Sequence, residues 1–104
     1  VFAGDLEEFK KVLALEPTLA AYEPPELIGS TETSVVQAEP EIIAKASVLA
    51  KEAGIPLIVG AGINSRDDVK KSLELGAVGV AVATDVVKAE DPRREILDLA
   101  EGFR

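Results

Sequence analysis

Apolar and polar positions follow two periods that alternate along the chain. Apolar residues recur every three or four positions in several segments, a spacing typical of amphipathic helices. These segments predict helices over residues 6–15, 40–53 and 66–75 and from residue 92 onward, with a short helical turn over 85–89. Short apolar runs between them predict strands at 1–3, 19–22, 55–59 and 78–83.

Polar, proline and glycine residues mark the ends of these helices. Asp5 is placed to cap the first helix, and Pro40 stands where the first residue of the second belongs. Ser65, followed three residues later by Asp68, resembles a capping box for the third helix. Gly54 is expected to end the second helix. The last helix is expected to bury an apolar face made by Ile96, Leu99, Ala100 and Phe103.

The alternation predicts an α/β fold with parallel strands and right-handed crossovers. The wholly apolar run at 55–59 is typical of a parallel strand that is covered by helices. Four parallel strands with alternating helices correspond to half of a (β/α)8 barrel, which takes roughly 200 to 250 residues when complete. With 104 residues, the chain is expected to form one (β/α)4 half-barrel over residues 1–104.

Residues 26–39 form the longest stretch without a strand or helix pattern. The stretch contains Gly29 and a cluster of Ser and Thr at 30–34. Loops of this length inside a compact domain are usually functional lids or disordered segments. The pattern leaves both interpretations open.

Composition removes several classes of chemistry. The chain has 19 acidic and 11 basic residues, a net charge of −8, which argues against nucleic-acid binding. It has no Cys and no His, which excludes disulfides, thiolate zinc sites, Cys nucleophiles and His-based triads. Nothing has metal-ligand spacing, and no cofactor is expected.

The sequence shows no targeting signal. No apolar run approaches the roughly 20 residues that span a bilayer, so no membrane association is expected. The N-terminus lacks the features of a signal peptide, which favours a cytoplasmic location. It also lacks an initiator Met, and we expect the chain to begin inside a longer protein.

Three motifs resemble one family, the archaeal triosephosphate isomerases. Residues 21–29 (AYEPPELIG) resemble the signature of the family's sixth strand. Residues 60–63 (GAGI), followed by 67–71, resemble its seventh βα unit, and 75–83 with 88–92 resemble the eighth. The resemblance covers essentially the whole chain and implies the C-terminal half of a TIM barrel, units five to eight.

The resemblance also implies an activity. The family interconverts dihydroxyacetone phosphate and glyceraldehyde 3-phosphate, small phosphorylated trioses of glycolysis and gluconeogenesis, through an enediolate. This isomerisation needs a carboxylate base to carry a proton between two carbons, and the matching position is Glu23. The family's electrophilic His and Lys belong to the first half of its barrel. Because this chain has neither, it is predicted to be inactive alone.

Glu23 ends a short apolar strand, and active sites of (β/α)8 barrels lie at the carboxyl ends of their strands. A closing lid would desolvate the carboxylate there, which raises its pKa and makes it a better base. A solvated Glu at a strand end is the alternative interpretation.

Backbone N–H groups of three segments are candidates for binding the substrate phosphate. Glycine permits close approach of the backbone to an anion, and a helix start favours negative charge. Residues 25–36 correspond to the family's mobile lid, which departs from the family at Thr31, where a second Gly is usual. Ser-Gly is usual in the family where Thr84 and Asp85 stand. Asp85 would either repel a phosphate or turn outward as a helix N-cap. Ordinary turn residues without a ligand are the alternative. The candidate phosphate-binding residues are Gly29, Ser30, Gly60, Ala61, Gly62, Ala83, Thr84 and Asp85.

A structural role is the rival hypothesis. Four strands leave two open edges and apolar surface that a monomer cannot cover. Leu57 and Val59 share one face of their strand, as do Val80 and Val82, and whichever of these face inward need a partner. The partner is expected to be a second copy or a complementary N-terminal half-barrel. A self-associating half-barrel module with residual phosphate binding would then result. A third possibility, a relative of thiamine-phosphate or indole-glycerol-phosphate synthases, is disfavoured by residues 23–29.

Overall fold

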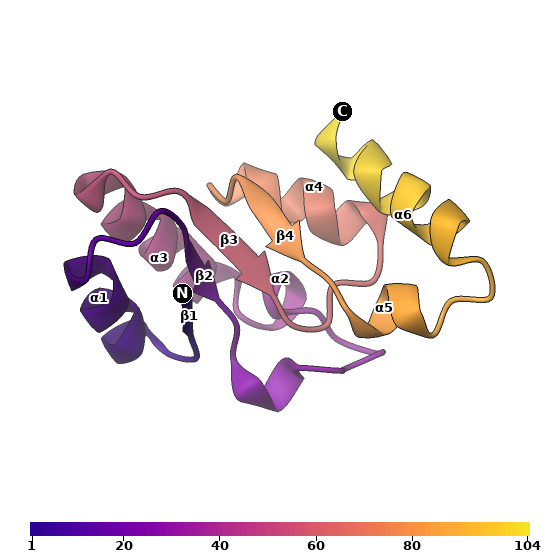
Figure 1. Ribbon diagram of the computed structural model, residues 1–104, viewed down its shortest axis with the longest axis horizontal. Helices are drawn as coiled ribbons and strands as arrows, with labels where there is room; N and C mark the ends of the chain where they lie inside the picture. Colours follow the sequence, from indigo (N-terminus) through magenta and orange to yellow (C-terminus); the bar gives the residue numbers. More distant parts are fainter.

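Four parallel strands form one sheet in the order β1-β2-β3-β4 in the computed structural model, which describes all 104 residues (Figure 1). The register pairs Ala3 with Tyr22, Tyr22 with Val59, and Val59 with Val80. The α/β half-barrel pattern of the sequence is therefore confirmed. The strands are β1 (Phe2–Ala3), β2 (Ala20–Tyr22), β3 (Leu57–Gly60) and β4 (Gly79–Ala81).

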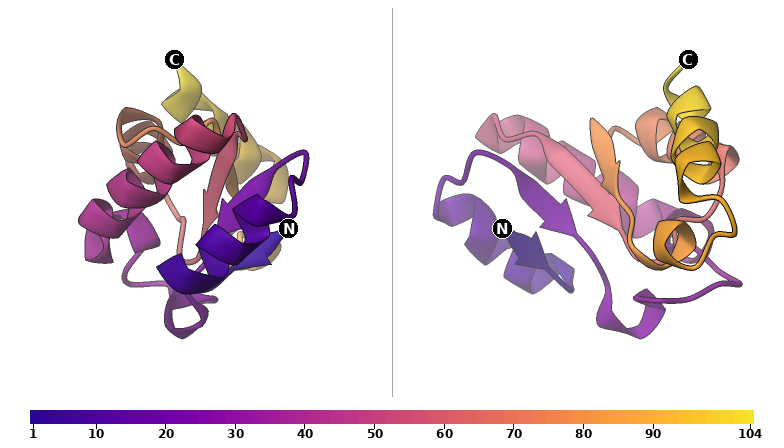
Figure 2. Two further views of the ribbon diagram at one scale, coloured as in Figure 1. Left: turned by 90° about the vertical axis from the view of Figure 1, so that its left-hand side faces the viewer. Right: turned by 45° about the vertical axis from the view of Figure 1, so that its right-hand side comes forward.

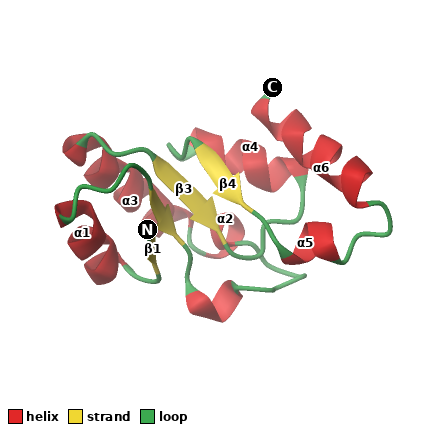
Figure 3. Cartoon of the chain, in the orientation of Figure 1, coloured by secondary structure: helices red, strands yellow, loops and turns green.

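Helices connect consecutive strands, and two more helices follow β4 (Figure 3). They are α1 (Leu6–Ala14), α2 (Val35–Ala38), α3 (Pro40–Ala53), α4 (Arg66–Glu74), α5 (Thr84–Val87) and α6 (Pro92–Ala100), with 3-10 turns at η1 (Pro25–Leu27) and η2 (Glu101–Phe103). Each predicted helix is present with ends shifted by a few residues. The sequential strand order with right-handed crossovers places the connecting helices on one face of the sheet.

The caps explain where two helices begin. The Asp5 side chain accepts a hydrogen bond from Glu8 N at 2.8 Å at the start of α1. Ser65 accepts one from Asp68 N at 3.1 Å at the start of α4, but the Asp68 carboxylate accepts from Asn64 N instead of returning to Ser65. The expected capping box at Ser65 is thus only half formed.

The segment over residues 26–39 is more ordered than the sequence pattern indicated. It contains η1 and the four-residue helix α2, which a reciprocal capping box between Ser34 and Gln37 initiates. Four residues are too few to show a helical period, so the pattern did not predict α2. Val35 and Val36 of this helix are both buried.

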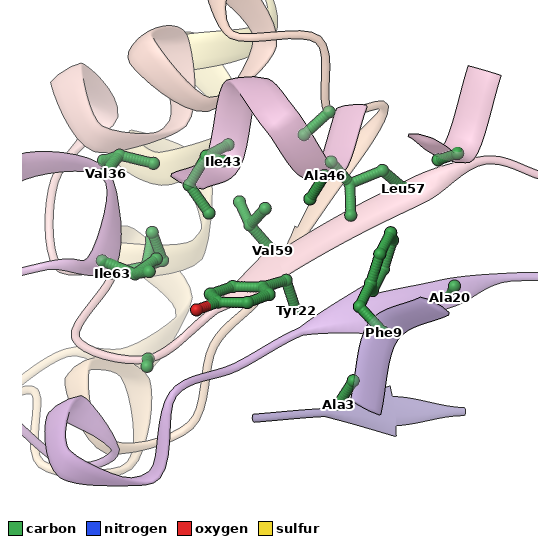
Figure 4. Packing of buried hydrophobic residues seen from close by; sticks show 14 of the residues in the cluster. Ala3, Phe9, Ala20, Tyr22, Val36, Ile43, Ala46, Leu57, Val59 and Ile63 are labelled. Atoms are coloured by element: carbon green, nitrogen blue, oxygen red, sulfur yellow. The ribbon is translucent and has the colours of Figure 1, made fainter. Parts of the chain in front are cut away.

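The main core lies between the sheet and its helices (Figure 4). Leu57, Val59 and Tyr22 point into it from the strands. The ring of Phe9 on α1 meets the Tyr22 ring edge-on, with centroids 6.4 Å apart. Tyr22 is 2% exposed and packs in the core on the face opposite Glu23. By register, Val80 lies on this same face.

The expected burial of the last helix is wrong for most of its residues. Leu99 is buried, but Ile96 is 53% and Phe103 50% exposed. They line a wholly apolar groove between β4 and α6. Helix α6 lies at the end of the molecule remote from α1 (Figure 2). Part of the uncovered apolar surface therefore lies beside the edge strand. The opposite face of the sheet carries Phe2, which is 61% exposed, and Ile58, together with the small residues Ala21, Gly60 and Ala81.

Two further properties concern membranes and metals. None of the helices has both the length and the apolar character that a bilayer crossing requires. No group of three or more acidic side chains is arranged to hold a metal ion.

Candidate active site

The loops that follow β2, β3 and β4 leave the same end of the sheet (Figure 1). They surround a cavity of about 240 Å³. Parallel strands bring their carboxyl ends together in this way, which is why residues distant in sequence meet here. The cavity is lined by Phe2, Glu23, Ile28, Gly29, Ser30, Ala61, Gly62, Ile63, Ala81, Val82, Ala83, Thr84 and Asp85. Every candidate site residue from the sequence is in this set except Gly60.

Glu23 directly follows β2 and is held by its backbone. Its N–H donates to Ala3 O at 2.8 Å, and the next residue, Pro24, is fully buried. The side chain is half-buried, and its carboxylate has no hydrogen-bond or ion-pair partner within the chain. Oε2 lies against the backbone of Gly60, where any side chain would overlap with it. Gly60 therefore provides the space that the Glu23 carboxylate occupies.

The loop after β3 has an unusual backbone. Ala61 has φ +85° and Gly62 φ +71°, both in the left-handed region. The N–H groups of Ala61, Gly62 and Ile63 donate no hydrogen bond within the chain, although all three residues line the cavity. Successive unpaired N–H groups of this kind form concavities that bind anions.

The loop after β4 adds a second set of unpaired donors. Ala83 N–H donates no hydrogen bond within the chain, and neither do those of Thr84 and Asp85 at the start of α5. Gly29 of the opposite segment, at φ +80°, lies against this loop, since a Cβ atom there would stand 3.8 Å from Thr84 Oγ1. The two segments thus border the cavity together.

Ser30 is already engaged within its own segment. Its N–H donates to Leu27 O at 3.0 Å, and its Oγ accepts from Thr33 N at 3.0 Å and from Glu32 N at 3.3 Å. In this conformation Ser30 stabilises a turn and offers no free N–H group to a ligand. Gly29 N–H, by contrast, has no partner within the chain.

Asp85 neither caps α5 nor turns outward, contrary to one of the two expectations. Ala83 occupies the N-cap position without a side-chain hydrogen bond, and Asp85 is the second residue of the helix. Asp85 Oδ2 is buried without a hydrogen-bond partner. A side-chain hydrogen bond with Asp85 raises the pKa of Glu95 on α6. The two carboxyl groups therefore lie next to each other beside the cavity.

Sequence reasoning missed Glu95, Phe2 and Ile28 as neighbours of the site. Glu95 is ten residues from Asp85 on another helix, and no sequence pattern connects them. Phe2 lies in the cavity wall because β1 pairs with β2. Strand β1 is too short for its apolar pattern to predict this position.

The chemistry available is that of a base beside an anion site. An ionised carboxylate can accept a proton, and the Glu23 carboxylate has no partner within the chain that competes for it. The free N–H groups on the two loops favour an anionic group at the other side of the cavity. The arrangement is suited to moving a proton on a small ligand whose anionic end is held by backbone donors.

Comparison with known proteins gives one consistent result. The family model described as triosephosphate isomerase matches residues 2–102. Triosephosphate isomerase from Thermoplasma volcanium is 49% identical over 94 residues, which are 90% of this chain and 44% of that protein. The enzyme from Cenarchaeum symbiosum is 49% identical over 104 residues, 99% of this chain and 46% of that protein. The chain thus spans less than half the length of these relatives.

Solved structures support the fold. A chain in the crystal structure of the Amycolatopsis orientalis BexX/CysO complex superimposes with a TM-score of 0.76 at 25% identity, over 97% of this chain and 39% of that one. The family match covers nearly every residue, including β2 to β4 and the loops around the cavity. The chain belongs to the triosephosphate isomerase family.

Proposed function

We propose that the chain is the C-terminal half-barrel of a triosephosphate isomerase that interconverts dihydroxyacetone phosphate and glyceraldehyde 3-phosphate in the cytoplasm. The observation that carries this proposal is the unpaired Glu23 carboxylate, which shares one cavity with the free N–H groups of two loops. Family membership supports the substrate class.

Glu23 is the base in this proposal. It takes a proton from the carbon that bears the hydroxyl group, while the neighbouring carbonyl oxygen gains negative charge, which produces the enediolate. It then returns the proton to the other carbon, while the hydroxyl proton passes to the oxygen of the former carbonyl through donor groups that a partner supplies. Atoms and charge therefore balance over the cycle. The N–H groups of Gly62 and of the loop after β4 hold the phosphate and fix the substrate relative to Glu23.

The half-barrel alone is proposed to be inactive. The enediolate oxygen needs positively polarised donors, and loss of one such donor typically costs about 10² to 10³ in rate. The chain has no His, and none of its Lys or Arg residues lines the cavity. The missing donors must come from a partner.

A complementary N-terminal half-barrel is the partner that fits best. The outer edges of β1 and β4 are unpaired, and the groove beside β4 is lined by apolar residues only. A second half with two strand edges of its own would pair with both and cover this groove.

Complementation tests the function directly. The chain is co-expressed with the part of the Thermoplasma volcanium enzyme that it does not match, and isomerase activity is measured in a coupled assay. We expect activity from the pair, none from either half, and none from a pair carrying Glu23→Gln. A pair that co-purifies in one-to-one ratio but shows the same rate as the Glu23→Gln control contradicts the proposal.

A self-associating module that retains only phosphate binding is the second candidate. The exposed apolar groove favours it, because two copies could cover each other's groove. Sedimentation of the chain alone, and of its mixture with the complementary half, distinguishes the two candidates. A stable closed dimer that does not exchange with the complementary half supports the module.

A further inference from the structure

Asp68 is a fully buried carboxylate without a cation. It is 2% exposed and lies in the first turn of α4, directly behind the loop that follows β3. The ion pairs of the chain join Lys10 to Glu7, Arg66 to Asp98 and Arg104 to Glu101, so none reaches Asp68. A buried carboxylate without a cation persists only where several donors satisfy it.

Three donors surround the Asp68 carboxylate, and two of them come from the segment over residues 26–39. Ser34 Oγ donates to Oδ1 at 2.8 Å, and Gln37 Nε2 donates to the same oxygen at 3.1 Å. Asn64 N–H, on the loop after β3, donates to Oδ2 at 3.1 Å. One carboxylate thus joins the start of α2 to the candidate phosphate-binding loop.

Further contacts connect the same two segments. Val35 N–H donates to Ala61 O at 3.0 Å, and Asn64 Nδ2 donates to Thr31 O at 3.2 Å. Gly62 packs so closely on the other segment that a Cβ atom there would lie 3.0 Å from Ser34 Cα. The backbone of Ala61 is in the left-handed region, and such a conformation persists only when its surroundings fix it.

Helix capping does not account for the Asp68 side chain. Ser65 already caps α4, through the hydrogen bond from Asp68 N. The backbone carbonyl of Asp68 is occupied by Ser72 Oγ at 2.7 Å, which is a contact separate from the carboxylate. Both carboxylate oxygens are used between elements, where they connect α2 and the loop after β3.

We propose that Asp68 is a positioning residue that fixes the lid, residues 25–36, to the phosphate-binding loop at residues 60–63, so that both respond together to a bound phosphate. This inference rests on the proposed function for the identity of the ligand. Asp68 touches no ligand and acts through Ser34, Gln37 and Asn64.

The test compares the wild-type chain with three variants by amide NMR. Asp68→Asn preserves the shape but replaces an acceptor oxygen by an NH2 group, so at least one of the three hydrogen bonds is lost. Asp67→Asn removes the same charge from the neighbouring exposed position of α4. Ser72→Ala removes the buried hydrogen bond that Ser72 Oγ donates to the backbone carbonyl of Asp68, and it leaves the Asp68 carboxylate untouched.

Hydrogen exchange is the first readout, because it needs no ligand. Loss of a hydrogen bond to a charged group should make Val35 N–H exchange at least about tenfold faster in Asp68→Asn, relative to the Val59 amide of the core. Asp67→Asn and Ser72→Ala should leave this ratio unchanged. An unchanged ratio in Asp68→Asn, or an equal rise in Ser72→Ala, overturns the proposal.

Titration with inorganic phosphate is the second readout, and mere destabilisation would not produce its pattern. In the wild type, the amides of Gly29 and Gly62 should shift with one common midpoint. In Asp68→Asn, Gly62 should still respond while Gly29 no longer does, and a retained common midpoint overturns the proposal. If the wild type shows no saturable shift, the phosphate site of the proposed function fails, and hydrogen exchange alone decides the role of Asp68.

Discussion

The Glu23 carboxylate lies against the backbone of Gly60 on the neighbouring strand, in the space that any larger residue at position 60 would fill. A Cβ atom at position 60 would overlap with Glu23 Oε2 and would stand 3.3 Å from both the Cβ and the carbonyl oxygen of Ala81. The strand β4 thus closes one side of this space and Glu23 the other. The position of the carboxylate depends on the absence of a single side chain.

Gly60→Ala should therefore displace Glu23. A shift of about 1 Å at a reacting group costs roughly 100-fold in rate, so the complemented pair should lose about that much in kcat. Phosphate binding should change little, because Gly60 does not line the cavity. Coupled assays and a phosphate titration measure the two effects separately.

Gly54→Ala is the control for Gly60→Ala. Gly54 has φ +71° but nothing within 4 Å of an added Cβ atom, so the change costs about 1 kcal/mol of stability without moving a neighbour. Its kcat should equal that of the wild type. An equal loss of kcat in both variants would mean that general destabilisation, and not displacement of Glu23, explains the effect.

Asp85→Asn should strengthen phosphate binding. The Asp85 carboxyl lines the cavity and lies beside Glu95, which adds negative charge where the anion binds. Removal of the negative charge of Asp85, close to the bound phosphate in a solvated site, should raise the affinity for phosphate about fivefold. Calorimetric titration with inorganic phosphate measures the change.

Glu90→Gln is the matched control for Asp85→Asn, since Glu90 is exposed and does not line the cavity. Its phosphate affinity should stay within twofold of the wild type. A tighter affinity in both variants would indicate that net charge, and not the position of Asp85, controls binding.

The sequence predicted the strands, the main helices and the meeting of Glu23 with the glycine-rich loops. These features depend on local periodicity and on the rule that parallel strands place their carboxyl ends together. It did not predict α2 or the inter-element role of Asp68. A helix of four residues has no period, and the spacing from Ser65 to Asp68 is equally typical of a capping box.

Burial of the last helix could not be inferred for a different reason. Its apolar face at Ile96, Leu99 and Phe103 has the right period, but only Leu99 is buried. Periodicity identifies an apolar face and not the element that covers it. The same limit applies to Val80, whose face of β4 opens into the apolar groove.

The apolar groove should control assembly. Ile96→Asp and Phe103→Asp place a charge in a surface that is exposed in the chain and buried in any complex that uses it. Each should weaken association with the complementary half at least about tenfold, because an unpaired buried charge is costly. Analytical ultracentrifugation measures the association. The chain itself should fold as before, since both side chains are half exposed.

Val48→Asp is the control for the groove variants. Val48 lies on α3, away from the groove, and is 57% exposed, which matches Ile96 and Phe103. It should assemble like the wild type. Assembly that is unaffected in the groove variants would mean that the partner binds elsewhere on the chain.

Tyr22 should make the stability of the chain sensitive to alkaline pH. Its hydroxyl donates to Glu39 Oε1 at 3.2 Å, and burial, followed by the charge of Glu39, raises the pKa of Tyr22 above its ordinary value of 10.0. The unfolded chain ionises its Tyr near pH 10 while the folded chain keeps the proton, so the unfolded state binds fewer protons there. The free energy of unfolding should therefore fall as pH rises through 10.

Tyr22→Phe isolates this contribution. The variant should lose about 1 kcal/mol at pH 7, where the hydrogen bond to Glu39 is intact in the wild type. Its free energy of unfolding should fall less steeply between pH 9 and 11, a range set by the ordinary pKa of 10.0 and the upward shift in the folded chain. Urea denaturation across this range measures both slopes. Parallel slopes would show that Lys side chains, and not Tyr22, dominate the alkaline loss, because only Tyr22 differs between the two proteins.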